Sequence, residues 1–404
     1  MDKALYWLWV QKTLGYHAKI NTLMRYYGSA EKLNNAGESS WRLSGLFGDE
    51  IPVSKISSMR NTSPEECLEV YNLCKREGVS VLTPEDENYP KELLKLPDYP
   101  AVLYVKGDIS FLNRCLSVAV IGTRKPSSYG KEICRKITEG ISAEGFAVIS
   151  GGALGIDSVS HKTAIEAGGK TVLVEGCGYK SGYLPENDEL RKAVSENGAV
   201  ISEYPPFTKA NSFTFPKRNR IISGLSKGVL VIEAGAKSGT LNTASHARAQ
   251  GKDLFVVPGD VASGMYTGSN RLLTEGAKAV FSSEDILKYY SDYVEFKNEK
   301  ITGEEPFSKI DRVKEERVKT KKAVKTLESD RKEVHNNKKI VNITAESVSV
   351  NAFLVYNLMS GKEMCLDDIV RESGLPVPKV LACLTELELM SAVRLMEGGR
   401  YSQI

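Results

Sequence analysis

Three cations stand within four residues of one another near the middle of the chain, directly after two phenylalanines. The cations are Lys217, Arg218 and Arg220, and the aromatic residues are Phe213 and Phe215. Guanidinium groups form bidentate pairs with phosphate oxygens, and aromatic rings stack on unpaired bases. This combination of residue types predicts a site for a phosphate ligand, a nucleic acid above all.

A helix is predicted to begin at these cations and to position them. Pro216 suits the first helical turn, where its missing N–H is not needed, and Ile221, Ile222 and Leu225 follow at helical spacing. The N-terminal end of a helix carries a partial positive charge, which adds to the attraction for an anion. The plainer alternative is a capped helix with a solvated basic face and phenylalanines in the core.

The composition is that of a globular protein with two or three domains. The 404 residues exceed the size of one hydrophobic core, the apolar fraction is 41%, and the net charge is only +3, so any affinity for nucleic acid must come from local patches. The seven cysteines include no Cys-x-x-Cys pair, which predicts reduced thiols and no metal site. Because the sequence shows no signal-peptide pattern and no run of about 18 apolar residues, we expect a cytoplasmic protein that does not cross a membrane.

The sequence pattern divides the chain into four segments. Residues 1–80 contain short apolar-periodic pieces separated by glycines, which predict a small helical domain similar to SAM or helix-hairpin-helix modules. Residues 81–294 alternate short apolar runs with helix-length segments. Residues 295–345 are rich in lysines and acids and poor in aromatics, which predicts a charged linker, and residues 346–404 are predicted to fold again.

The apolar runs of the second segment predict an α/β domain with a parallel sheet. Strands that are apolar throughout are typical of a parallel sheet covered by helices on both faces, and ligands of such sheets bind at the carboxyl ends of the strands. The runs occur at residues 101–105, 117–121, 147–149, 171–174, 199–201, 229–232 and 254–257.

Turns that contain glycine follow most of these predicted strands. Glycine lets the backbone approach a ligand closely and lets its N–H groups point at phosphate. The turns lie at residues 122–130, 150–157, 175–178, 233–240 and 258–260. Neither a Gly-x-Gly-x-x-Gly order after residues 117–121 nor a Gly-x-x-x-x-Gly-Lys-Ser/Thr loop is present, which disfavours ordinary NAD or ATP chemistry, and we expect no cofactor.

The motifs at these turns resemble those of the DNA-processing protein A family, also called DprA or Smf. The resemblance spans the whole central domain in order and rests on Gly122-Thr-Arg, Ser127 with Tyr129-Gly130, Ser150-Gly-Gly-Ala, Gly155-Ile-Asp157 with His161, Ser202-Glu203, Phe215-Pro, Arg218-Asn-Arg-Ile-Ile222, Ser238-Gly-Thr240, Pro258-Gly259 and Gly268-Ser-Asn270. Members of that family have a Rossmann-like central domain that binds and protects single-stranded DNA and hands it to the RecA recombinase during natural transformation. The resemblance implies this fold and function, no catalysis, and a homodimer formed through the central domain.

The resemblance and the glycine turns together predict the residues that bind DNA. The resemblance implies that Arg124, Lys217, Arg218 and Arg220 lie near the DNA path and that Phe215 lies close to the bases. The full predicted set is Gly122, Thr123, Arg124, Ser127, Ser150, Gly151, Gly152, Phe215, Lys217, Arg218, Asn219, Arg220, Ser238, Gly239, Thr240, Gly259 and Asn270.

Two positions depart from the family pattern. Leu154 stands where the family often has arginine, and Gly182-Tyr-Leu-Pro185 replaces the usual Tyr-Pro after the third parallel strand. We expect both departures to weaken phosphate binding and to leave the fold unchanged.

Four ionisable residues near the turns are predicted to support the site structurally. Asp157 begins a predicted helix and His161 follows one turn later, so an acid–base couple is the alternative interpretation. Glu203 and Glu233 follow strands and are expected to accept hydrogen bonds from turn amides or a sugar hydroxyl. No nucleophile stands at a recognised spacing from them. His17 is interpreted as a surface or packing residue, because no second histidine or cysteine lies at metal spacing.

The last segment has the pattern of a winged helix. Three predicted helices are followed by two short strands at 392–396 and 398–401. The third helix carries Lys379 with Glu386 and Glu388, whereas recognition helices usually present several cations. We therefore expect a protein-contact or structural role for this domain.

Three functions remain as hypotheses from the sequence. The first is a recombination mediator that binds single-stranded DNA and loads RecA. The alternative is a nucleotide-binding or nucleotide-cleaving Rossmann-like enzyme that would use Asp157, Glu203 or Glu233. A third hypothesis, a regulator of duplex DNA acting through the winged helix, predicts a preference for duplex over single strands.

Overall fold

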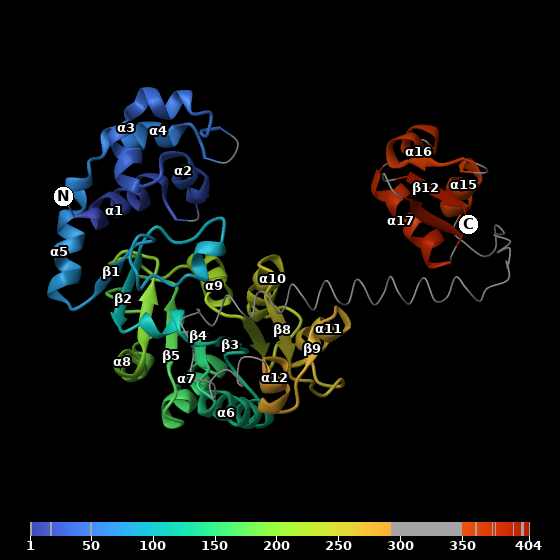
Figure 1. The fold of residues 1–404 in the computed structure, drawn as a ribbon. Helices are drawn as coiled ribbons and strands as arrows, with labels where there is room; N and C mark the ends of the chain where they lie inside the picture. Colours follow the sequence, from blue (N-terminus) through green and yellow to red (C-terminus); the bar gives the residue numbers. More distant parts are fainter. Residues whose placement is uncertain are drawn as a thin grey trace. The chain divides into compact units, whose positions relative to one another are not determined.

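The computed structural model describes residues 2–291 except 17, 49 and 50, and residues 350–403 except 360, 361, 374, 376, 391 and 397–399. It divides the chain into two compact units, residues 1–314 and 315–404 (Figure 1). The linker predicted at 295–345, His17, and Gly398 and Gly399 of the predicted wing lie outside the described residues.

Helices build the first part of unit 1, as the sequence predicts. Their order is α1 (Lys3–Leu14), α2 (Ile20–Tyr27), α3 (Ala30–Leu43), α4 (Ser54–Asn61), the 3₁₀ turn η1 (Pro64–Cys67) and α5 (Leu68–Arg76). Asp2 caps α1 by accepting a hydrogen bond from the N–H of Ala4 at 3.1 Å. The indoles of Trp9 and Trp41 are buried, and each donates to a backbone carbonyl at 2.8 Å, so these large side chains leave no polar atom unpaired.

A nine-stranded sheet forms the centre of the described part of unit 1. Its strands are β1 (Ser80–Leu82), β2 (Leu103–Gly107), β3 (Ser117–Ile121), β4 (Ala147–Gly151), β5 (Thr171–Glu175), β6 (Ala199–Ser202), β7 (Gly228–Val231), β8 (Asp253–Val256) and β9 (Lys278–Ala279). The strand order is β1-β2-β6-β5-β4-β3-β7-β8-β9. Strands β3 to β9 pair in parallel, which confirms the predicted Rossmann-like α/β class.

Two features at one side of the sheet differ from the prediction: the edge strand β1 was not predicted, and β2, predicted as part of a parallel sheet, pairs only in antiparallel fashion. β1 pairs with β2, and β2 pairs with β6, in antiparallel fashion. The connection between β1 and β2 contains only the short 3₁₀ turn η2 (Leu93–Lys95), whereas a parallel pair needs a crossover that usually contains a helix.

Helices cover both faces of the sheet (Figure 1). They are α6 (Ser128–Ala143), α7 (Ile156–Glu166), α8 (Asp188–Asn197), α9 (Thr214–Gly224), α10 (Thr240–Ala249), α11 (Thr267–Thr274) and α12 (Ser283–Tyr289), with 3₁₀ turns η3 (Ser110–Asn113) and η4 (Pro185–Asn187). Alternate residues of β3 enter different cores: Val118 packs in the core formed with α6, and Ala119 in the core formed with α9. Because both faces are buried, every residue of β3 is buried.

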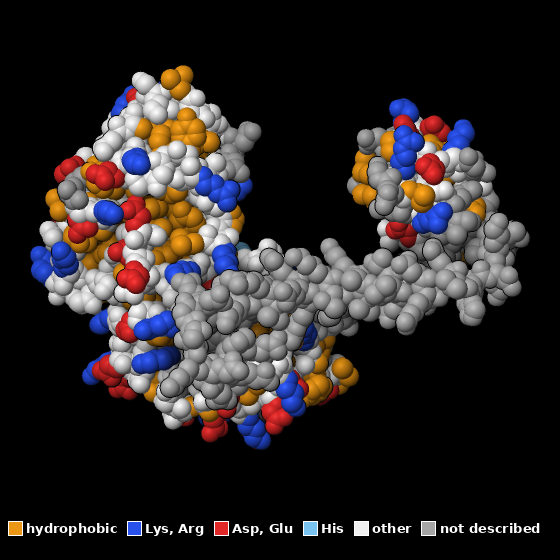
Figure 2. All heavy atoms as spheres, viewed as in Figure 1, with side chains coloured by type: hydrophobic (Ala, Val, Ile, Leu, Met, Phe, Trp, Pro, Cys, Tyr) orange, Lys and Arg blue, Asp and Glu red, His pale blue; other side chains and the backbone are white. Residues whose placement is uncertain are grey.

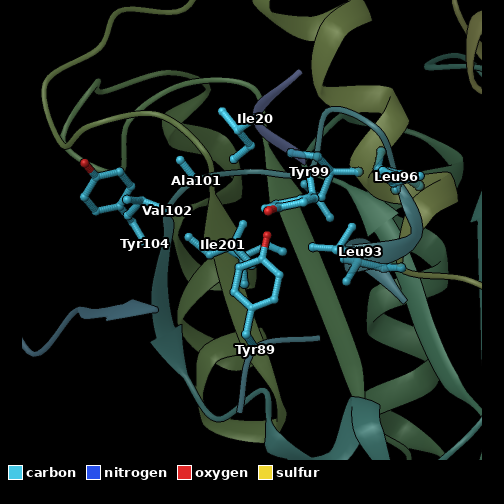
Figure 3. Close-up of a cluster of buried hydrophobic side chains, with 14 of the residues drawn as sticks. Ile20, Tyr89, Leu93, Leu96, Tyr99, Ala101, Val102, Tyr104 and Ile201 are labelled. Carbon is cyan, nitrogen blue, oxygen red and sulfur yellow. The ribbon is translucent and has the colours of Figure 1, made fainter. Parts of the chain in front are cut away.

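A cluster of tyrosines and aliphatic residues joins the N-terminal helices to the sheet (Figure 3). Tyr89 is buried and its hydroxyl donates to the carbonyl of Pro100 at 2.6 Å. The hydroxyl of Tyr104, on β2, donates to the side-chain oxygen of Gln11 at 2.9 Å, and the amide of Gln11 donates to the carbonyl of Glu203 at 2.9 Å. Helix α1 is therefore bonded directly to the carboxyl end of β6.

A buried carboxylate beside this cluster contacts three lysines. Glu92 lies 2.9 Å from the ammonium groups of both Lys227 and Lys252 and 3.0 Å from that of Lys95. Burial opposes the charge of Glu92, yet the lysines outweigh it and lower the pKa of its carboxyl to about 2. The network connects η2 with the residues that directly precede β7 and β8.

Unit 2 has the winged-helix architecture that the sequence predicts. Its elements are α15 (Val350–Leu358), β10 (Met364–Cys365), α16 (Leu366–Ser373), α17 (Val377–Leu389), β11 (Val393–Met396) and β12 (Arg400–Gln403). The three strands pair in the order β10-β12-β11. The buried residues Val355, Ile369, Val380 and Leu384 hold the three helices together.

The lysine network around Glu92 gives a prediction about stability. We expect Glu92→Gln to lower the free energy of unfolding by about 3–5 kcal/mol, because it leaves buried ammonium groups without their carboxylate. Since the folded pKa is depressed, the contribution of Glu92 is fully present above about pH 4.5 and is lost as the pH falls toward 2. Urea denaturation followed by circular dichroism at pH 7 and at pH 3 measures both effects.

Glu132→Gln is the matched control, because Glu132 forms an exposed pair with Lys136 at 2.8 Å. Such surface pairs contribute about 0–1 kcal/mol. Equal losses for Glu92→Gln and Glu132→Gln at pH 7 would contradict the predicted role of the buried network.

Candidate nucleic-acid interface

A pocket of about 880 Å³ opens at the carboxyl edge of the parallel sheet. Its walls come from the turn after β3, the segment after β7 and the beginning of α9. Strands β4, β5 and β6 extend the sheet on one side of β3, while β7 and β8 extend it on the other. Such a reversal of strand order opens a crevice between neighbouring turns, which is where open α/β sheets bind ligands.

The pocket brings together much of the predicted DNA-binding set. Predicted residues that line it are Gly122, Thr123, Arg124, Phe215, Arg218, Asn219, Ser238, Gly239 and Thr240, together with Asp157 from the predicted support group. The first and last of these segments, 122–124 and 238–240, are more than 100 positions apart in the sequence, so the fold brings them together.

Several lining residues were not predicted. They include Lys125, Tyr183, Asn211, Asn242 and Thr243. The ring of Tyr183 lies against that of Phe215, with centroids 5.0 Å apart. Tyr183 belongs to the segment 182–185 that departs from the family pattern. That departure is the sequence signal that could have identified Tyr183 as a site residue.

Arg218 is held in the wall of the pocket. Its side chain is buried, its Nη1 donates to the carbonyl of Val174 at the end of β5, and its Nε donates to Oδ1 of Asn219 at 3.2 Å. The guanidinium carbon lies 5.9 Å from the centre of the Phe215 ring. Burial lowers the pKa of Arg218, and the nearby carboxylates of Asp157 and Glu175 oppose this effect.

Asp157 is the one carboxylate among the residues that line the pocket. Burial raises its pKa to about 6, although Arg218 and the N–H of Ala153, 3.4 Å away, favour the charged form. Gly151 packs beneath this pair: a Cβ at that position would lie 2.6 Å from Oδ2 of Asp157 and 2.9 Å from Nη2 of Arg218. A larger residue at 151 would therefore displace both groups.

His161 does not form the acid–base couple that the sequence left open. Its Nδ1 lies 2.7 Å from the hydroxyl of Thr171 and its Nε2 lies 3.0 Å from the carbonyl of Gly151. Because a carbonyl only accepts, Nε2 carries the proton in this arrangement. Burial lowers the pKa of His161 to about 4, so at neutral pH it is an uncharged bridge between α7 and the strands β4 and β5.

Positive charge dominates the pocket. The charged lining residues are Arg124, Lys125 and Arg218 against Asp157. Arg124 and Lys125 are exposed, and within the described residues neither side chain forms an ion pair. On the face of the molecule shown in Figure 2, basic and acidic side chains are interspersed, so the excess of cations in the pocket is a local feature.

Lys217 and Arg220 flank Arg218 in the sequence and do not line the pocket. Lys217 is exposed. Arg220 is buried, and its guanidinium donates to Glu203 at 2.7 and 3.0 Å and to the carboxylate of Asp98 at 2.8 Å. Although burial opposes the charge of Arg220, these carboxylates raise its pKa above the ordinary value, so its donors are already engaged within the protein.

Ser127 and Glu233 bond each other beside the pocket. Glu233 accepts from the hydroxyl of Ser127 at 2.8 Å and from the hydroxyl of Tyr266 at 3.3 Å. Ser127 also caps α6 by accepting from the N–H of Gly130 at 2.9 Å. This network ties the turn after β3 to the segment after β7.

Asn270 and three residues of β4 and its turn also lie outside the pocket lining. The side chain of Asn270 bonds both the N–H and the carbonyl of Gly259, at 3.1 and 3.0 Å. Ser150 donates to the carbonyl of Val120 at 2.6 Å. Gly152 lines a small adjoining hollow that includes Arg124, Phe215 and Arg218.

The described residues contain no group of three or more histidine, cysteine, aspartate or glutamate side chains that could hold a metal ion. Within the same residues, no helix is both long and apolar enough to cross a membrane.

The chain is similar to known proteins over the segment that forms the sheet and the pocket. The family model of DNA recombination-mediator protein A matches residues 80–291, and that of the DprA winged-helix domain matches residues 352–399. The DNA processing protein DprA of Bacillus subtilis (strain 168) is 39% identical over 214 residues, which cover 53% of this chain and 72% of that protein. The one from Streptococcus pneumoniae (strain ATCC BAA-255 / R6) is 39% identical over 202 residues, which cover 50% of this chain and 71% of that protein.

A solved structure extends the similarity beyond the sheet. The crystal structure of DNA processing protein A from Streptococcus pneumoniae superimposes with a TM-score of 0.61 at 30% identity and covers 70% of this chain and 95% of that chain. The family model accounts for more than half of the sequence, in the same segment that builds the sheet and the pocket. The chain therefore belongs to the family of DNA recombination-mediator protein A, also named DprA or Smf.

Proposed function

We propose that this protein is a recombination mediator that binds single-stranded DNA in the pocket between β3 and β7. One observation carries the proposal: Arg218 and Phe215 lie together in a pocket whose exposed cations, Arg124 and Lys125, have no ion partner among the described residues. The cations suit backbone phosphates and the aromatic ring suits a base, which is the combination that single-strand-binding proteins use.

The position of the aromatic residues favours single strands over duplex DNA. Phe215 is partly buried, with Tyr183 against its ring. A base reaches such a ring only if its face is free, whereas bases in a duplex are stacked on their neighbours. Because every base has such a face and phosphates carry no sequence information, binding is expected to depend little on sequence and to weaken with salt.

Membership of the family supports the wider role. We propose that the protein acts in the cytoplasm as a homodimer, protects incoming single strands during natural transformation, loads RecA onto them and catalyses no reaction itself. The predicted contacts of Lys217, Arg220, Ser127, Ser150, Gly151, Gly152, Gly259 and Asn270 remain part of the proposal, with Arg220 the residue whose donors are most fully engaged by protein groups.

The raised pKa of Asp157 favours the alternative function, a nucleotide-binding or nucleotide-cleaving enzyme. A carboxyl with a pKa of about 6 is suited to proton transfer near neutral pH. Incubation with a panel of nucleotides tests this alternative, and turnover that disappears in Asp157→Asn would establish it. A duplex-DNA regulator would instead bind matched duplex more tightly than single strands and retain that binding in Arg218→Ala.

The first prediction for the pocket concerns its arginines. We expect Arg218→Ala to weaken binding of a labelled oligo-dT strand by about 1.5–3 kcal/mol, the range for a hydrogen bond to a charged group. Arg124→Ala, at an exposed position that leaves the fold undisturbed, is expected to weaken binding and to reduce the slope of log K against log salt by about 0.7. Fluorescence-anisotropy titrations at several salt concentrations measure both changes.

Arg76→Ala serves as the control, because Arg76 is exposed on α5 and does not line the pocket. If Arg218→Ala and Arg124→Ala bind single strands as tightly as Arg76→Ala does, the pocket is not the DNA site.

The second prediction concerns pH. Because burial raises the pKa of Asp157 to about 6, its negative charge develops between about pH 5 and pH 7 and repels a bound phosphate. Wild-type affinity for oligo-dT is expected to fall over this range, and Asp157→Asn is expected to bind several-fold more tightly than wild type at pH 7.5 but equally at pH 5. If the affinities of the two proteins for oligo-dT change with pH in the same way, the charge of Asp157 does not affect binding.

The third prediction concerns the departure at Leu154, a side chain that is 44% exposed beside the pocket residue Ala153. Leu154→Arg is expected to tighten binding of oligo-dT and to increase the salt slope by about 0.7, because it adds one phosphate contact. Leu154→Gln is the uncharged control. An unchanged salt slope in Leu154→Arg would place residue 154 away from the strand.

A further inference from the structure

A second hollow lies between α6 and α7, whereas the cluster of Lys217, Arg218 and Arg220 belongs to α9. Its volume is about 260 Å³, and we call it the α6/α7 groove. The residues that line it and matter here are Lys131 and Arg135 from α6, and Gly155, Ser158, Lys162 and Glu166 from α7 and the turn before it.

The α6/α7 groove is positively charged and its cations are not neutralised by the protein. Lys131, Arg135 and Lys162 face a single lining carboxylate, Glu166, and none of the three forms an ion pair within the described residues. Lys136 on the same helix behaves differently, because it pairs with Glu132 at 2.8 Å. The free cations are therefore concentrated on the side of α6 that borders the groove.

One short turn separates this groove from the pocket described above. Ala153 and Asp157 line the pocket, whereas Gly155 and Ser158 line the groove. Gly155 has a φ of 87°, and a Cβ there would lie 2.4 Å from the carbonyl oxygen of Thr123. The same Cβ would lie 2.7 Å from the Cα of Arg124, so Arg124 stands directly beside the turn that joins the two hollows.

The arrangement of the cations suits an elongated anion better than a small one. Lys131 and Arg135 are one helical turn apart, about 6 Å along α6, and Lys162 lies on the opposite wall. Lys131 and Arg135 are therefore spaced along one wall of the groove, with Lys162 across from them. A polyphosphate chain that leaves the pocket past Arg124 would meet them in succession.

We propose that the α6/α7 groove is a second segment of the binding path, in which the backbone phosphates of the same single strand that occupies the pocket contact Lys131, Arg135 and Lys162. This inference rests on the proposed function of the pocket. It adds that the strand passes over the turn at Gly155 and continues between α6 and α7, so longer strands gain contacts that short strands lack.

Strand length separates the two segments experimentally. We expect the triple variant Lys131→Gln/Arg135→Gln/Lys162→Gln to bind a strand of about six thymidines, a length that one binding groove accommodates, as tightly as wild type does. For a strand of about 20 thymidines it is expected to bind tenfold or more weakly, with the salt slope reduced by about 2, because three phosphate contacts of about 0.7 each are lost.

A second triple variant controls for overall charge. Lys3→Gln/Lys136→Gln/Lys288→Gln also removes three positive charges, from exposed lysines that pair with acids elsewhere in unit 1, and it is expected to bind both strands like wild type. Circular dichroism of each variant checks that the exposed substitutions leave the fold intact.

Each other outcome overturns the inference. If the groove variant binds the long strand like wild type, or if the control variant loses as much, the groove is not on the path. If the groove variant loses equally on the short strand, its cations act on the pocket and not beyond it. The proposed function fails separately, when Arg124→Ala and Arg218→Ala bind the short strand like wild type.

Discussion

The buried ion pair of Arg220 fixes the helix on which the pocket depends. Its guanidinium bonds Glu203 after β6 and Asp98 in the segment before β2, and the carbonyl of Glu203 accepts from Gln11 of α1. Burial of a charge is unfavourable unless its donors are satisfied, and here two carboxylates satisfy them. Helix α9 is thereby bonded at Arg220, in its second half, to the residue after β6 and, through that residue, to α1.

This anchor explains why two arginines so close in sequence differ in surroundings. Residues two apart on an α-helix are rotated by about 200° around its axis, so Arg218 and Arg220 point to nearly opposite sides of α9. Arg220 is directed toward Glu203 and the N-terminal helices, whereas Arg218 is directed toward the pocket and the end of β5. Arg220 therefore fixes α9 from one side, and Arg218, the candidate for phosphate binding, remains on the pocket side of the same helix.

The sequence was sufficient for the fold class because short apolar runs such as 118–121, alternating with helix-length segments, are typical of parallel strands buried on both faces. Pro216 likewise located the beginning of α9 to within two residues. The antiparallel pairing of β1 and β2 was not predictable, since the choice of neighbouring strand depends on contacts between distant segments. For the site, the glycine turns indicated the edge of the sheet at which the pocket opens. The sequence could not show that Asn270 bonds the backbone of Gly259, or that Tyr183 reaches the ring of Phe215, because both facts depend on how side chains meet across the folded domain.

The burial of Arg218 explains why a carboxylate, that of Asp157, lies in a pocket whose other charged residues are cations. Removing a guanidinium from water is costly, and without negative neighbours the charged form of Arg218 would be disfavoured. Asp157 and Glu175 stabilise that charge, yet neither lies within 4.0 Å as a direct ion pair with Arg218 in the described structure. Glu175 is instead bonded to Arg191 at 2.5 Å, and Asp157 accepts from the N–H of Ala153 at 3.4 Å. Arg218 therefore lines the pocket without a close ion partner among the described residues, and an entering phosphate would supply that close negative partner.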